Sequence, residues 1–203
     1  MTKKNESNKN EQLQNQILFN RRLCPQLFKS IEWSLLASYK SKLNYLCNII
    51  AVEKDSIVGT DRKKLHLTYM NNVVIPTGIY CITKINSEEV WLVRQDTKYP
   101  NWKEIIPNYE NYNSFVAHSP LEFCYGCFLN HIAINHQFIE KLFQFEEKFR
   151  VYLNPDSNIT PIFCKTVDSS PKLNPIPTHI ALIMPITLDK IEFTIPKNKK
   201  TKK

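Results

Sequence analysis

Glycine is scarce in this chain, with 3 residues in a length of 203. Loops that cradle phosphate groups depend on glycine, because a residue without a side chain lets the backbone come close to the phosphate. Neither of the two common spacings, GxGxxG and GxxxxGK, occurs in the sequence. The sequence therefore excludes the nucleotide-binding classes that are built on such loops.

Long apolar runs are also missing. No stretch approaches the roughly 18–20 apolar residues that a helix needs to cross a bilayer, and the first ten residues lack the apolar core of a signal peptide. Apolar residues nevertheless make up 42% of the chain and aromatic residues 11%, which is typical of a globular protein. We therefore expect a cytoplasmic globular protein whose thiols are reduced.

The spacings that catalysis requires are absent as well. Asp61 and Lys63 are distantly similar to the D…K arrangement of nucleases, but no supporting carboxylate stands at the required spacing. No two of the candidate acids, bases and ligands have a spacing such as HExxH; these residues are Asp61, Glu88, Glu89, Asp96, His118, His131 and His136. We predict that the protein is not an enzyme and has no cofactor.

The chain contains 6 cysteines, and two of them raise the question of a metal site. Cys124-Tyr-Gly-Cys127 has the spacing of a zinc knuckle, and His131 and His136 follow it. No second CxxC is present, and the histidine pair alone does not close the site, so structural cysteines are the preferred interpretation and zinc is the alternative. Three further cysteines stand in apolar, strand-like runs and are predicted to be buried free thiols: Cys47, Cys81 and Cys164.

Positive charge is concentrated at the C-terminal end. The net charge is +8, and Lys197–Lys203 alone contains five lysines. Such a tail either holds phosphate groups weakly and without sequence preference or serves as a solubilising extension, and both interpretations stay open. We expect a disordered polar N-terminus over 1–16, one folded domain over 17–190 and a basic tail over 191–203.

The apolar pattern predicts a strand, a helix and a series of strands, and then the same order again. Helices are expected at 25–42, where Pro25 suits a helix start, and at 135–148. Residues 98–112, rich in Pro, Asn and Tyr, are expected to be irregular. Strands are expected at 17–23, 44–52, 57–69 (two strands around a turn), 78–85, 90–94, 121–132, 149–153, 160–167 and 179–186. This order predicts an α+β domain.

Three segments, in this order, resemble the bacterial DNA polymerase III β subunit, the replicative sliding clamp. Leu43-Asn44 followed by Thr60-Asp-Arg-Lys-Lys-Leu65 resembles the clamp's Leu-Asn-Gly and Ala-Thr-Asp-Gly-His-Arg-Leu. Lys98–Pro107 resembles Arg-Phe-Pro-Asp-Tyr-x-x-Val-Ile-Pro, and the segment from Phe128 to Met184-Pro185 resembles the last half of the clamp's third domain. Arg62 stands where the clamp has its second Gly, which matters if that position needs a positive φ.

This resemblance implies a single clamp-like domain of two βαβββ units, with the helices on one side of the sheets. The bacterial subunit has three such domains, whereas this chain has room for one. Clamps bind a short apolar peptide of a partner protein, such as a DNA polymerase, in a surface cleft. The matching positions are Leu43, Thr60, Lys63, Lys64, Leu65, Pro107, Leu182, Met184, Pro185 and Ile186. Thr187 stands where the clamp has Arg.

The resemblance also implies non-specific contact with DNA, because the helices of a clamp face the duplex and carry basic residues. The candidate DNA contacts are Lys29, Lys40, Lys42, Lys141, Lys148, Lys197, Lys199 and Lys200. A single domain can encircle DNA only as a homo-oligomer. Because the second helix is nearly neutral, the alternative is a monomeric module that uses the clamp fold to capture a protein or to bind DNA non-specifically.

Overall fold

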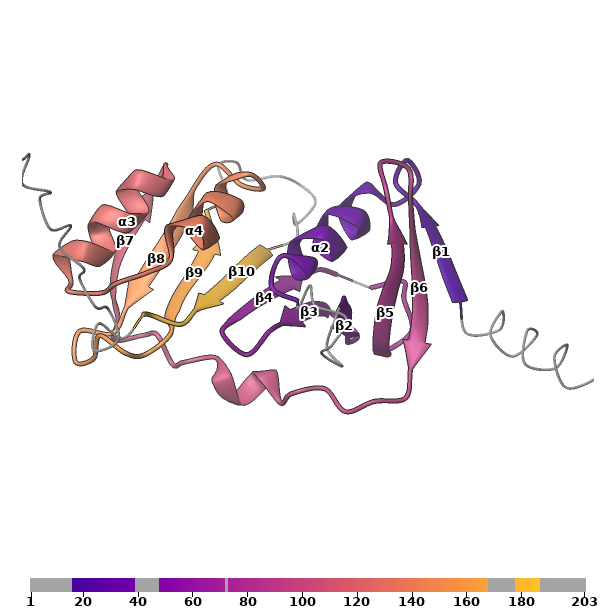
Figure 1. The fold of residues 1–203 in the computed structure, drawn as a ribbon, viewed down its shortest axis with the longest axis horizontal. Helices are drawn as coiled ribbons and strands as arrows, with labels where there is room; N and C mark the ends of the chain where they lie inside the picture. Colours follow the sequence, from indigo (N-terminus) through magenta and orange to yellow (C-terminus); the bar gives the residue numbers. More distant parts are fainter. Residues whose placement is uncertain (1–15, 39–47, 72, 168–177, 187–203) are drawn as a thin grey trace, which may run out of the picture.

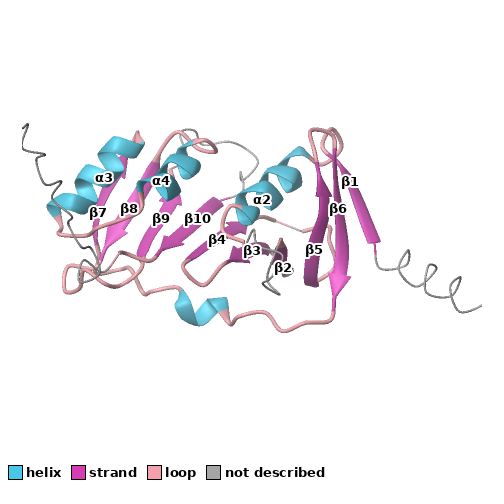
Figure 2. Cartoon of the chain, viewed as in Figure 1, coloured by secondary structure: helices cyan, strands magenta, loops and turns pink. Residues whose placement is uncertain are grey.

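A computed structural model describes residues 16–38, 48–71, 73–167 and 178–186. Ten antiparallel strands form one sheet in the order β1-β6-β5-β2-β3-β4-β10-β9-β8-β7, and the helices lie on one of its faces (Figures 1 and 2). No helix among these residues is both long and apolar enough to cross a membrane.

The first half of the sheet comes from the N-terminal part of the chain. It contains β1 (Gln16–Asn20), α2 (Pro25–Leu35), β2 (Ile49–Val52), β3 (Ser56–Thr60), β4 (Lys64–Tyr69), β5 (Gly78–Ile85) and β6 (Glu89–Gln95). A connecting segment with a short 3-10 helix, η1 (Trp102–Ile105), leads to the second half. That half contains β7 (Asn113–Ala117), α3 (Pro120–Leu129), α4 (His136–Phe143), β8 (Phe149–Leu153), β9 (Ile162–Thr166) and β10 (Thr178–Ile183).

The two halves meet where β4 pairs with β10. Six residue pairs run from Tyr69–Thr178 to Lys64–Ile183. Since β4 also pairs with β3, and β10 with β9, this seam makes two smaller sheets continuous. Four strands of the second half and six of the first therefore form a single surface that the helices cover.

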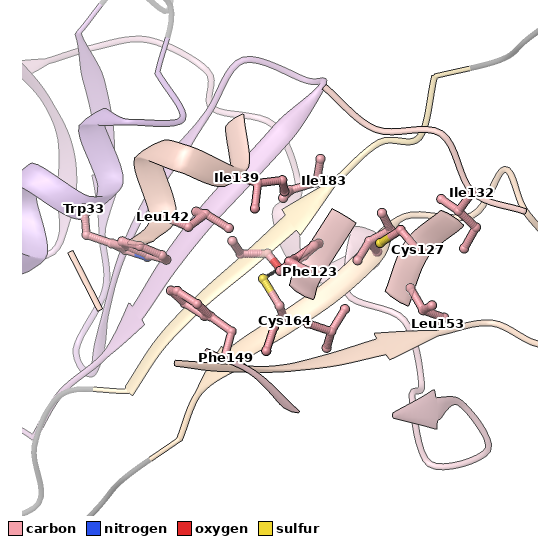
Figure 3. Packing of buried hydrophobic residues seen from close by; sticks show 14 residues of the cluster. Trp33, Phe123, Cys127, Ile132, Ile139, Leu142, Phe149, Leu153, Cys164 and Ile183 are labelled. Atoms are coloured by element: carbon pink, nitrogen blue, oxygen red, sulfur yellow. Dashed lines mark hydrogen bonds between the residues drawn. The ribbon is translucent and has the colours of Figure 1, made fainter. Parts of the chain in front are cut away.

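Each face of the sheet carries its own core. On the helix face, one cluster gathers α2 with β2, β3, β5 and β6, and a second gathers α3 and α4 with β8, β9 and β10 (Figure 3). On the other face, the connecting segment places Tyr99, Trp102 and Tyr109 over the outward side chains of β3, β4, β9 and β10. The segment between the halves therefore helps to hold both of them.

The α+β class and the common side of the predicted helices are confirmed. Trp33 of α2 lies in the same cluster as Ile139 and Leu142 of α4, so both helices cover the same face. The predicted βαβββ repeat needs refinement, because five strands follow α2 in the first half and a second helix, α3, precedes α4 in the other. Both helices are also shorter than predicted, ending at Leu35 and Phe143, and residues 39–42 lie outside the described part of the chain.

The prediction of a strand over 121–132 was wrong, because this stretch forms α3. Ser119 caps the helix, since its side chain accepts a hydrogen bond from the backbone N–H of Glu122, and Pro120 occupies the first turn. Ser-x-x-Glu is the start signal of a helix, and it outweighs the aromatic and cysteine residues that suggested a strand. The remaining predicted strands are observed, two of them with the predicted bounds (78–85 and 149–153) and the others with shifted ends, although residues 44–47 are not described.

Gly59 lets α2 approach the sheet closely. A Cβ atom at this position would stand 1.9 Å from the backbone oxygen of Ser34 and 2.6 Å from its carbon. Because backbone atoms of a packed helix cannot move aside as a flexible side chain can, any larger residue would push α2 away from β3.

We therefore expect Gly59→Ala to lower the free energy of unfolding by about 3 kcal/mol or to prevent folding. Gly78→Ala is the matched control, because its Cβ would meet the Arg94 side chain at 3.2 Å and the Tyr80 ring at 3.3 Å, both of which can shift. Urea unfolding monitored by circular dichroism measures both variants. Equal stabilities of the two variants would contradict the close contact between α2 and β3.

Candidate functional site

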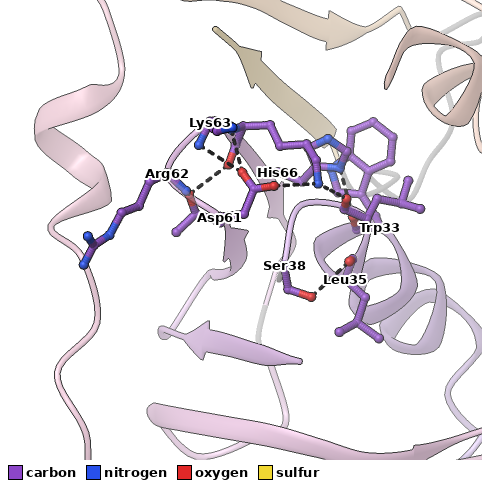
Figure 4. Close-up of polar contacts among 10 residues, drawn as sticks. Trp33, Leu35, Ser38, Asp61, Arg62, Lys63 and His66 are labelled. Atoms are coloured by element: carbon purple, nitrogen blue, oxygen red, sulfur yellow. Dashed lines mark hydrogen bonds and ion pairs between the residues drawn. The ribbon is translucent and has the colours of Figure 1, made fainter. Parts of the chain in front are cut away.

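The β3–β4 turn is held by its own polar groups. The Asp61 Oδ1 atom accepts hydrogen bonds from the backbone N–H groups of Lys63 and Lys64, each at 2.9 Å. The Thr60 hydroxyl donates to the carbonyl of Lys64 at 2.8 Å and accepts from the N–H of Arg62 at 3.0 Å. These bonds fix the turn that precedes the seam strand β4 (Figure 4).

Arg62 adopts a left-handed backbone conformation with φ of 69°. The concern raised by the sequence is therefore confirmed, since this position does need a positive φ. That conformation costs a residue with a side chain roughly 1–2 kcal/mol. The hydrogen bonds of Asp61 and Thr60 offset this cost and place the exposed side chains of Arg62 and Lys63 beside the seam.

Lys64 ties the turn to both halves of the molecule. Its ammonium group lies 3.0 Å from Asp61 Oδ2 and donates to the carbonyl oxygen of Leu36, just beyond α2, at 2.6 Å. It also lies 5.3 Å from the centre of the Phe138 ring of α4. The turn is thus anchored to the helix layer of each half.

A small pocket opens where this turn meets the end of β10. Leu65 and Leu182, which are 2% exposed, form its base, whereas Ile105 and Met184 are 40% and 42% exposed and stand at its mouth. The backbone N–H of Met184 donates to the carbonyl of Lys63 at 3.0 Å, so the end of β10 is bound to the turn. The lining residues are Thr60, Arg62, Lys63, Lys64, Leu65, Ile105, Pro161, Leu182 and Met184. We call this site the seam pocket.

Solved structures of sliding clamps share this architecture. The H. pylori β clamp in complex with diflunisal has a TM-score of 0.54 and 15% sequence identity over 80% of this chain. The Thermotoga maritima DNA polymerase III β subunit has a TM-score of 0.52 and 13% identity over 85% of the chain. The Bartonella birtlesii sliding clamp bound to griselimycin has a TM-score of 0.53 and 11% identity over 85% of the chain.

This chain has the sliding-clamp fold. The matched region spans 64%, 65% and 66% of the three clamps, so the chain corresponds to only part of each one. No family model matches the sequence, and no curated protein does either. The resemblance read from the sequence is therefore confirmed for the fold.

Six of the ten predicted peptide-site residues line the seam pocket. Pro107 is not among the lining residues, and Pro185 and Ile186 follow Met184 without lining it; Leu43 lies outside the described residues. The six are Thr60, Lys63, Lys64, Leu65, Leu182 and Met184.

The sequence interpretation did not assign three lining residues to the pocket. Ile105 and Pro161 belong to segments that resemble the clamp, but the resemblance did not single out these two residues. The sequence interpretation noted Arg62 only because it stands where the clamp has a glycine. Its place between Asp61 and Lys63 in a tight turn is the signal that could have included it.

Three of the eight predicted DNA contacts, Lys29, Lys141 and Lys148, lie within the described residues. The Lys29 ammonium group donates to Glu146 Oε1 at 2.7 Å, which neutralises much of its charge. Lys141 and Lys148 are half-buried, in the last turn of α4 and directly before β8. The other candidates lie outside the described residues: Lys40, Lys42, Lys197, Lys199 and Lys200.

Cys127 and Cys164 are buried in the apolar core of the second half, as predicted for Cys164, whereas Cys81 is only half-buried, which corrects its predicted burial. Cys127 is buried on α3, and this burial raises the pKa of its thiol to about 12; burial also raises the pKa of Cys124 and Cys164. A thiol with a raised pKa is a poor nucleophile. Among the described residues, no three His, Cys, Asp or Glu side chains come together as metal ligands.

Two buried histidines flank Trp33 at the seam. The His66 ring lies 4.5 Å from Trp33, and its Nδ1 atom donates to the Trp33 carbonyl at 3.0 Å. The His179 ring lies 5.1 Å away on the β10 side, and its Nδ1 atom is 2.8 Å from Glu146 Oε1. Burial raises the pKa of Glu146, but hydrogen bonds from His179 and Lys29 outweigh it and leave that pKa below its usual value.

Full burial lowers the pKa of His66 to about 3, so the ring is neutral in the folded protein. In the unfolded chain this histidine has the ordinary pKa of about 6.5, so it takes up a proton below that pH. The stabilising contribution is therefore complete above pH 6.5 and is lost progressively between pH 6.5 and pH 3.

We expect the free energy of unfolding to fall by about 2 kcal/mol more in the wild-type protein than in His66→Gln when the pH changes from 7.5 to 5. Urea unfolding at the two pH values measures this difference. His118→Gln replaces an exposed histidine and serves as the control, which should keep the wild-type pH dependence. A pH dependence of His66→Gln equal to that of the wild type would contradict the buried neutral state.

Proposed function

We propose that this chain is a non-catalytic, clamp-like protein of DNA replication or repair that binds a short apolar peptide of a partner protein in the seam pocket. The observation that supports this most directly is the convergence of six residues, matched to the clamp's peptide site from sequence, around one surface pocket. Four of them come from β3, β4 and the turn between these strands, and two from β10 and the residue that follows its end, more than a hundred residues further along the chain.

The pocket has the features of a site for an apolar side chain next to acidic residues. Leu65 and Leu182 offer an apolar base, and Met184 is an unbranched side chain that can move aside. Such movement is necessary, because the hollow now has a volume of only about 20 Å³. Arg62 and Lys63 are exposed at the rim, so acidic groups beside the apolar residues of the peptide would find favourable charge there.

Met184→Lys tests the pocket. We expect the affinity for a labelled clamp-binding peptide to fall at least about 30-fold, because a charge replaces the movable apolar wall. Fluorescence anisotropy measures the binding, and circular dichroism shows whether the variant is folded. Val74→Lys is the control, since Val74 is 67% exposed and lies beyond the opposite end of β4.

A folded Met184→Lys variant with unchanged peptide affinity would rule out the seam pocket as the binding site. The charged rim gives a second readout with the same assay. Changing both Arg62 and Lys63 to Glu should lower the affinity for a peptide with acidic flanks. The same change should raise the affinity for the peptide that carries lysines in those positions. A loss of affinity for both peptides would indicate damage to the turn instead of a charge effect.

Contact with DNA is the less specific part of the proposal. Lys29 is paired with Glu146, whereas Lys197–Lys203 holds five lysines and no acidic residue, so we infer that the C-terminal lysines supply most of the attraction to DNA. Binding that depends on such lysines is weak, independent of sequence and sensitive to salt. This pattern favours a module that contacts DNA non-specifically, without encircling it, as the second candidate function.

Changing the five lysines of Lys197–Lys203 to Gln should reduce the slope of log affinity against log salt by about 4. Anisotropy with labelled duplex DNA at several salt concentrations measures the slope. Retention on closed circular DNA compared with linear DNA distinguishes a ring from simple contact. Greater retention on the circle, in the wild type and in the Gln variant, would contradict the module and support encirclement by an oligomer.

A further inference from the structure

Helix α3 carries an apolar stripe that nothing in the described structure covers. Four of its ten residues are large apolar side chains with high exposure. They are Leu121 (76%), Tyr125 (60%), Phe128 (72%) and Leu129 (59%). Isolated exposed apolar residues are common, but a contiguous group of this kind marks an interaction surface. We call these four residues the α3 stripe.

The stripe lies opposite the side of α3 that packs on the sheet. Phe123 and Cys127 are buried against β7, β8 and α4, and at 100° per residue the stripe points away from them. The core of the second half is therefore already complete without these four side chains. Figure 1 shows α3 at the outer end of the helix layer, above the edge strand β7.

The spacing of the stripe is that of a helix that packs against another helix. Leu121, Tyr125 and Phe128 are separated by four and then three residues, with Leu129 beside the last of them. This four-three alternation gives the side chains that interlock between two paired helices. The partner of the stripe should therefore be an apolar helix.

Charge points the same way. Glu122 is the only charged residue of α3, and its carboxylate accepts a hydrogen bond from the backbone N–H of His118 at 2.8 Å. A neutral stripe offers no positive charge to phosphate groups, so DNA does not fit it. Because the stripe carries no charge, two identical stripes do not repel each other.

We propose that α3 is a self-association surface, on which the α3 of a second copy packs antiparallel around a two-fold axis. Neither α2 nor α4 has a large apolar side chain among its exposed residues, so within the described chain a second α3 is the helix that matches the stripe. In a two-fold arrangement the same surface serves both copies, and Tyr125 of each copy lies near the axis.

The area is sufficient for a modest interface. The four side chains together expose on the order of 500 Å² of apolar surface. Two copies would therefore bury about 1,000 Å², near the lower limit for a specific protein–protein interface. We expect a dimer that dissociates in the micromolar range. In such a two-fold pair each copy uses its α3 stripe for the other copy, so the interface joins two chains and does not build a ring.

Sedimentation equilibrium of the full-length protein over a range of concentrations tests this inference. We expect a monomer–dimer equilibrium in the wild type, and a dissociation constant at least about 100-fold higher in the double variant Leu121→Lys and Phe128→Lys. The control, Leu23→Lys with Val74→Lys, adds the same charge at side chains that are 83% and 67% exposed elsewhere. It should dimerise as the wild type does.

A wild-type chain that remains monomeric at high concentration would overturn the inference, whether its own residues 187–203 or a different protein then covers the stripe. Equal association of the α3 variant and the wild type would also overturn it. Peptide binding to the seam pocket is measured separately, so failure of this inference and failure of the proposed function are distinguishable. Circular dichroism confirms that both double variants are folded.

Discussion

The indole of Trp33 is the contact on which both halves of the molecule depend. It is fully buried, and its N–H group lies 3.3 Å from the carbonyl of Leu67 in β4 and 3.2 Å from the carbonyl of Ile180 in β10. One donor thus contacts both strands of the seam. The Phe149 ring of the second half lies stacked 6.0 Å away, and Figure 3 shows Trp33 at the margin of that half's core.

The contacts of Trp33 with β4 and β10 also determine where the seam pocket lies. Because α2 can sit close to the sheet only above Gly59, Trp33 reaches the β4–β10 pair, and the ends of these two strands come together. The turn at Arg62 and the end of β10 at Met184 then enclose the pocket. A site built on two sheet strands is held more precisely than one built on free loops. Peptide binding, if it occurs as proposed, would act on the same seam that joins the halves.

The sequence carried enough information to predict the strands of the first half, the common side of the helices and most of the seam pocket. The apolar pattern predicted the strands, and the resemblance carried by short segments predicted the helix side and the pocket residues: the Thr60–Leu65 turn, the Lys98–Pro107 segment and the strand that ends before Met184-Pro185. Helix α3 was not predicted. Its exposed residues Leu121, Tyr125 and Phe128 are apolar, so the helix lacks the usual contrast between an apolar and a polar face. Where a stripe outside the core is as apolar as the side facing the core, periodicity alone cannot distinguish helix from buried strand.

The seam itself could not be predicted, because pairing of β4 with β10 joins residues more than a hundred positions apart. Nor does any local signal show that Trp33 of the first helix belongs to the core of the other half. Its neighbours Ile31, Leu35 and Leu36 give the same helical pattern as any amphipathic helix. The two histidines beside it, His66 and His179, are unremarkable in sequence and acquire their environment only from the completed sheet.

Native-state hydrogen exchange tests most directly whether the seam makes the two halves one unit. The slowest amides of β5 in the first half and of β8 in the second should exchange with the same free energy, that of global unfolding. Trp33→Phe, which removes the indole donor, should lower both values equally, by about 2–3 kcal/mol. If instead one half exchanges at its own lower free energy, or Trp33→Phe affects only the first half, the seam does not couple the halves.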